Sequence, residues 1–139
     1  MANTFVAPFA QKFKLVTAIV TAASGGIGTS TVTGLQPIAT GGANGSLITR
    51  ITALPRATAT ASSLILFIAK AATPAVFVMV DSELMAAYTL ATTTAIPETT
   101  FGNITSSVGI PLEQGDVLYV GSQVALAAGI AFSAWQADL

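Results

Sequence analysis

The sequence predicts an all-β fold, either a sandwich or a barrel, in a single domain. Three observations lead to this prediction. Apolar or alternating segments recur about every 8–12 residues, and segments rich in Gly or Pro separate them. Thr, Val and Ile, which favour strands, are frequent in these segments. The chain has 139 residues, which is enough for one ordinary domain and too few for two.

The first half of the chain contains four segments with the composition of strands. A Gly-rich loop at 37–45 divides them, and Asn44-Gly45 within it predicts a tight turn. Pro55 interrupts the third segment, because proline cannot donate a backbone hydrogen bond to a neighbouring strand. The four predicted strands cover residues 14–22, 30–35, 47–54 and 57–62.

The second half begins with two apolar segments, 64–69 and 75–80, and the first is apolar on both faces, as in the central strand of a sandwich. Residues 81–88 are expected to form one helical turn or a crossing loop. Two further strands are predicted at 116–121 and 124–134, the second from apolar side chains on alternate positions. The expected core consists of Leu64, Leu66, Phe67, Ile68, Phe77, Val78, Val80, Val117, Leu118, Val120, Leu126, Ile130 and Phe132.

The few charged residues exclude several classes of function. The chain has 5 basic and 6 acidic residues, a net charge of −1, no Cys and no His. Without Cys or His, it has no thiol nucleophile, zinc finger, haem ligand or His-based triad. Its sparse, scattered basic residues exclude a nucleic-acid partner. Charged residues make up 8%, against about 25% in an average soluble domain. We therefore expect a homodimer or trimer that hides part of its surface.

A membrane partner is also not expected. The uncharged stretch at 117–135 is long enough to cross a bilayer. However, its middle contains Gly121, Ser122, Gln123 and Gly129, and small residues outnumber leucine in it. The stretch is better explained as two strands, because its bulky apolar side chains alternate.

One segment resembles an enzyme motif. Residues 20–28 (VTAASGGIG) resemble the nucleotide-binding turn of short-chain dehydrogenases. Ala22 replaces the first glycine of that motif, a strand-forming segment follows in place of a helix, and no Tyr-x-x-x-Lys pair is present. The segment is therefore interpreted as a Gly-rich hairpin between two strands.

The carboxylates offer no better catalytic candidate. Asp81 and Glu83 lie two residues apart, and Glu113 and Asp116 lie three apart in a predicted turn. We interpret them as solvated charges, because such residues are usually exposed. The sequence thus predicts no enzyme, no catalytic residues, no cofactor and no metal site.

Three segments point to a family. Residues 47–70 (LITRITALPRATATASSLILFIAK), 84–97 (LMAAYTLATTTAIP) and 112–121 (LEQGDVLYVG) resemble virion proteins of tailed bacteriophages. In size and in residue pattern the chain is most similar to small capsid cement (decoration) proteins. The resemblance implies an antiparallel β-sandwich of jelly-roll or a related type, and the spacing of the segments predicts seven to nine short strands in it. The resemblance also implies a protein that self-associates and bridges subunits of the major capsid protein on the outer surface of the capsid.

The alternative is a tail or baseplate β-module with a receptor- or carbohydrate-binding role. Such a binder needs exposed aromatic side chains beside polar groups, and the chain has only Trp135, Tyr88 and Tyr119 as polar-tipped aromatics.

Residues 1–13 are interpreted as an N-terminal arm, and residues 14–139 as the sandwich domain. The arm is apolar but has no clean helix or strand period. Large apolar groups at a terminus usually mark a contact site. We therefore expect the arm to insert against a neighbouring subunit or the capsid shell, although it could instead fold back over its own sandwich. The expected partner contacts are Phe5, Val6, Phe9 and Phe13.

Overall fold

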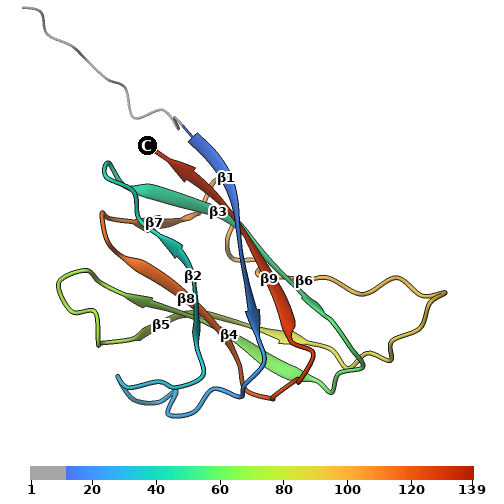
Figure 1. Ribbon diagram of the computed structural model, residues 1–139. Helices are drawn as coiled ribbons and strands as arrows, with labels where there is room; N and C mark the ends of the chain where they lie inside the picture. The colour runs from blue at the N-terminus through green and yellow to red at the C-terminus, as the bar shows by residue number, and fades with distance from the viewer. Residues whose placement is uncertain (1–11) are drawn as a thin grey trace, which may run out of the picture.

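The computed structural model describes residues 12–139, which form two antiparallel sheets packed against each other (Figure 1). No helix occurs among these residues, so none is present that could span a membrane. The predicted all-β sandwich is confirmed. The strands are β1 (Lys12–Val20), β2 (Gln36–Thr40), β3 (Ser46–Pro55), β4 (Ser62–Ala69), β5 (Val78–Met85), β6 (Thr99–Thr100), β7 (Ile110–Leu112), β8 (Val117–Ser122) and β9 (Ile130–Asp138).

The strand order follows from nested pairing along the chain. The first sheet has the order β1-β9-β3-β6, with β7 also paired to β3, and the second has the order β2-β8-β4-β5. Thus β1 pairs with β9, β2 with β8, β3 with β6 and β7, and β4 with β5. The first and last strands, β1 and β9, pair without a register shift, so that Lys12 lies opposite Asp138 and Val20 lies opposite Ile130. This pairing brings the C-terminus beside the start of β1 (Figure 1).

The core lies between the two sheets and confirms much of the sequence-based prediction. Of the expected core residues, Ile68, Phe77, Val117 and Leu126 are only half-buried. Phe67 is also buried, but it lies on the outer face of the second sheet and not between the sheets. The expected core residues that are fully buried between the sheets are Leu64, Leu66, Leu118, Val120, Ile130 and Phe132.

The second sheet is covered on its outer face as well. Val32, from the connection between β1 and β2, packs with Ile65 and Phe67 of β4 in a second apolar cluster. This connection, residues 21–35, includes the Gly-rich segment, and Gly25 and Thr33 exchange two backbone hydrogen bonds in it. A Cβ atom at Gly121 of β8 would lie only 2.5 Å from Ser24 Oγ. Glycine at this position therefore lets the connection lie close against the sheet.

The prediction for residues 75–88 is wrong in part. Residues 81–85 belong to β5, not to a helical turn or a crossing loop. Because β5 is the edge strand of the second sheet, Val78 and Val80 are not core residues: 56% and 43% of their surface is exposed. The inward positions next to them carry Asp81 and Glu83, which lie opposite Leu66 and Leu64 of β4 and are half-buried.

Other strand boundaries also differ from the prediction. The Gly-rich loop predicted at 37–45 contains most of β2, whose pairing with β8 outweighs its weak local signal. Residues 30–35 and 57–62 make only isolated bridges before their neighbouring strands begin. Residues 124–129 form a turn, which Gly129 closes with a φ of 89° and a hydrogen bond to the carbonyl of Leu126.

Candidate assembly surface

The outer face of the first sheet carries large apolar side chains. Alternation along β1 directs Val16, Ala18 and Val20 toward the core, and it leaves the odd-numbered residues on the opposite face. Phe13 is 79% exposed, and Trp135 of β9 is 37% exposed. We call this surface the apolar face and define it by Phe13, Leu15, Ile19, Leu54 and Trp135.

Strand register arranges the apolar face in rows across β1, β9 and β3. Leu15 lies opposite Trp135, which in turn lies opposite Arg50 of β3. Ile19 lies opposite Ala131, and Ala131 lies opposite Leu54. Each row therefore combines side chains from the beginning, middle and end of the chain, and only the folded sheet brings them together.

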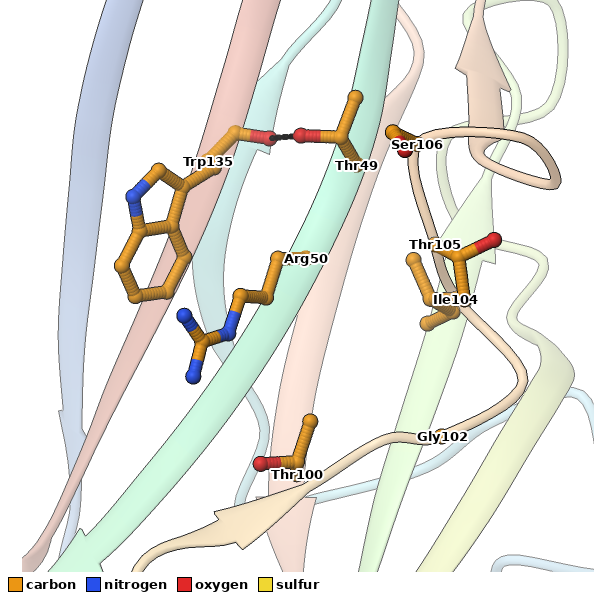
Figure 2. A pocket seen from close by; sticks show the side chains of 8 residues that line it. All are labelled: Thr49, Arg50, Thr100, Gly102, Ile104, Thr105, Ser106 and Trp135. Atoms are coloured by element: carbon orange, nitrogen blue, oxygen red, sulfur yellow. Dashed lines mark hydrogen bonds between the residues drawn. The ribbon is translucent and has the colours of Figure 1, made fainter.

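A bulge in β3 sets the position of Arg50. The register between β3 and β9 shifts between Ile48 and Arg50, so Thr49 is the extra residue. Thr49 Oγ1 donates a hydrogen bond of 3.4 Å to the carbonyl oxygen of Trp135, and Arg50 lies beside the indole ring (Figure 2). The guanidinium carbon is 4.9 Å from the ring centre, within the range of a cation–π contact. On its other side, Arg50 Nη2 donates to Glu98 Oε1 at 2.9 Å.

Trp135 stands between two open hollows. The larger, about 460 Å³, lies between Arg50 and the loop after β6, and hydroxyl-bearing residues line much of it (Figure 2). The smaller, about 260 Å³, lies toward β1 and is lined by Phe13 and Leu15 among others. The residues around the larger hollow are Thr49, Arg50, Thr100, Gly102, Ile104, Thr105, Ser106 and Trp135.

A polar network fixes the strand ends beneath Phe13. Lys14 Nζ forms an ion pair of 3.2 Å with Asp138 Oδ2, and Ser46 Oγ donates to Asp138 Oδ1 at 2.5 Å. Buried Gln136 donates from Nε2 to the same oxygen at 2.9 Å and to the Thr40 carbonyl at 3.0 Å. The Ser46 hydroxyl, with help from Lys14 and Gln136 and against the effect of burial, holds the pKa of Asp138 below its ordinary value. The network thus joins β1, β3 and β9 at one end of the apolar face.

One carboxylate interpreted as a solvated charge is in fact buried. Asp116 is only 1% exposed. Lys70 Nζ donates to Asp116 Oδ2 at 2.5 Å, and the backbone N–H groups of Ala71 and Glu113 each donate at 3.0 Å. Burial alone would raise the pKa of Asp116, but these donors together hold the pKa below its ordinary value. The expectation was wrong because the three hydrogen bonds that this carboxylate accepts compensate for the free-energy cost of removing it from water.

Of the predicted partner contacts, only Phe13 can be located, and it lies in β1 on the apolar face. Phe5, Val6 and Phe9 lie outside the described residues. Nothing in the sequence pattern marks Trp135, Leu15 or Ile19 as surface residues. The alternation in β1 carries a signal for two faces, but both faces are apolar, so the pattern does not reveal which of them is exposed.

Within residues 12–139, no three carboxylates gather where they could hold a metal ion. No family model matches the chain, and it finds no match among the curated proteins or the solved structures compared with it. Chemically, the surface offers apolar contact, one aromatic–cation pair and a hydroxyl-lined hollow, all of which suit binding.

Proposed function

We propose that this protein is a structural virion protein that decorates a bacteriophage capsid and stabilises it by bridging subunits of the major capsid protein. The observation that carries the proposal is the apolar face. Large apolar side chains that gather on one exposed surface usually mark a site of protein association. The resemblance of three segments to phage virion proteins supports this choice of partner.

The composition of the apolar face suits a protein partner. Burial of apolar surface contributes about 25 cal/mol per Å², so five large side chains on one face supply a strong driving force. Trp and Arg are the residues that most often dominate interface energies, and here Trp135 and Arg50 are in contact. The hollows on either side of Trp135 can receive side chains of the partner.

We further infer that the sandwich is of jelly-roll type. If β6 and β7 are counted as one interrupted strand, the pairs nest as first with last, second with seventh, third with sixth and fourth with fifth. A long hairpin that is rolled into two sheets gives this pattern, which is the eight-strand arrangement of capsid and lectin domains. The slight negative charge favours an outer position on the capsid, away from the packaged DNA.

Binding to capsid shells tests the proposal. Empty shells of the major capsid protein from the same phage are mixed with the chain and sedimented. Leu15→Asp places a charge on the apolar face, opposite Trp135, and should abolish cosedimentation. Leu84→Asp is the matched control, because Leu84 of β5 is 67% exposed but lies in the other sheet. Equal binding by both variants, or no binding by the unchanged protein, would refute the proposal.

The hollow beside Trp135 favours a second candidate, a tail or baseplate module that binds a receptor carbohydrate. An aromatic ring beside Thr49, Thr100, Thr105 and Ser106 offers a stacking surface and hydroxyl groups to a sugar. A glycan array with the unchanged protein and a Trp135→Ala variant tests this candidate. Binding of a host surface glycan that is lost in the variant, together with tail labelling in electron micrographs, would favour it over the capsid.

A further inference from the structure

The sheet edges in the described part of the chain differ in how well they are protected from pairing. Natural proteins protect edge strands by making them short or by adding bulges, prolines and inward-facing charges. β6 and β7, at one edge, have two and three residues. β2 has five, with Pro37 and a register shift beside it. β5 is longer, but it has a register shift and carries Asp81 and Glu83 at half-buried inward positions.

β1 is the exception among these edges. It has nine residues, contains no proline and pairs with β9 over its full length without a register shift. Within residues 12–139, no strand pairs with its other edge. Its charged residues are Lys12 and Lys14, both near one end, and Lys14 is paired with Asp138. A long, regular edge of this kind is a site for the addition of another strand.

We propose that β1 pairs antiparallel with β1 of a second copy of this chain, about a two-fold axis at Val16. This register uses all nine residues. It places Phe13 opposite the partner's Ile19 and Leu15 opposite the partner's Thr17 on the outer face, pairs that stabilise a sheet. Lys14 then faces the partner's Ala18, so no lysine faces another. The strand is therefore complementary to itself, as a two-fold interface requires.

The dimer also explains how the protein could bridge two capsid subunits, an argument that rests on the proposed function. A two-fold axis perpendicular to a continuous sheet keeps the same face of both copies on the same side. The two apolar faces would then form one surface of double width. A dimer with such a surface can contact two neighbouring capsid subunits at once, which is what a bridging protein needs.

Two matched double variants test the edge pairing in sedimentation experiments on the full chain without shells. Phe13→Glu with Ile19→Lys places opposite charges across the proposed interface. Phe13→Lys with Ile19→Lys places like charges there and removes the same apolar surface. We expect the dissociation constant of the dimer to be about tenfold larger for the second variant. Equal dissociation constants, or a monomeric unchanged protein, would overturn the proposal.

Cysteine cross-linking tests the register, because the chain has no native Cys. In the proposed dimer, the two copies of Val16→Cys face each other, at a spacing that a disulfide can span. The two copies of Phe13→Cys lie about 20 Å apart in the same sheet. We expect cross-linking of the first variant only. Cross-linking of Phe13→Cys would indicate association through the apolar faces and contradict edge pairing. Shell binding is measured separately, so failure of the dimer does not count as failure of the capsid proposal.

Discussion

Arg50 and Trp135 are in contact across the first sheet, with the guanidinium carbon 4.9 Å from the centre of the indole ring. Glu98 binds the same guanidinium from the loop side at 2.9 Å. The arrangement joins β3, β9 and the residue just before β6. It holds the sole tryptophan of the chain in a fixed orientation on the apolar face.

Arg50→Ala should therefore loosen Trp135 with little effect on the fold. Exposed cation–π contacts are worth about 0.5–1 kcal/mol, and we expect a loss of stability of that size. Urea unfolding followed by fluorescence measures it, since Trp135 is the only tryptophan. Arg50→Lys keeps the charge and should lose less. A loss of several kcal/mol would mean that Arg50 supports the core instead.

Asp116 should make the protein sensitive to acid. Its pKa is lowered in the folded protein, so its contribution to stability is complete above about pH 5 and is lost as the pH falls through the folded pKa. Asp116→Asn should cost about 2 kcal/mol at pH 7 and should flatten the decline of stability toward low pH. Denaturant unfolding between pH 2.5 and pH 7 measures both effects.

Glu113→Gln is the control for this prediction, because the Glu113 side chain is 82% exposed and lies beside the same lysine. Its substitution should change stability by less than about 0.5 kcal/mol at any pH. If Asp116→Asn shows the same pH dependence as the unchanged protein, another group controls the acid transition.

Gly121→Ala should displace the connection at 21–35. The added Cβ would lie 2.5 Å from Ser24 Oγ and 2.6 Å from Leu35 Cδ2, both closer than such atoms approach. We expect a loss of about 1–3 kcal/mol from this overpacking. Hydrogen exchange should show faster exchange at the amides of Gly25 and Thr33. Ser24→Ala removes one of the two contacts, so combining it with Gly121→Ala should recover part of the loss.

Deletion of residues 1–10 tests the interpretation of the N-terminal arm. If the arm acts as an adhesive element, the truncated chain keeps its thermal stability and loses binding to shells. Unfolding of the truncated chain, or binding equal to that of the full chain, would show that the arm has another role. Thermal denaturation and cosedimentation with shells provide the two measurements.

The sequence was sufficient for the fold class because the fold class depends on local spacing. Strands such as β4 and β8 are marked by continuous or alternating apolar residues. β2 was not predictable, because Pro37 and the glycines after it resemble a loop, and its pairing with β8 is a long-range interaction. The last residues of β5 were missed for a similar reason: Asp81 and Glu83 disfavour a strand locally, whereas pairing with β4 imposes one.

The apolar face was harder to predict than the core. Leu15 and Ile19 alternate with Val16 and Ala18, so β1 is apolar on both sides, and only its position in the sandwich decides which side is exposed. The contact between Arg50 and Trp135 depends on a bulge, and residues 85 positions apart in sequence carry no local signal for it.

The connection at 21–35 makes the two outer faces of the molecule chemically different. It seals the outside of β4 and β8, and Thr29, Ser30, Thr31 and Thr33 of that connection are exposed to solvent. Under the proposed function, a copy that binds the capsid through the first sheet presents this uncharged, hydroxyl-bearing surface to its surroundings. The large apolar side chains that the second sheet does expose, Val78, Met79, Val80 and Leu84, lie on its edge strand β5, beside this surface. The medium around a coated particle would therefore meet mainly hydroxyl groups over β4 and β8, and apolar side chains only along β5.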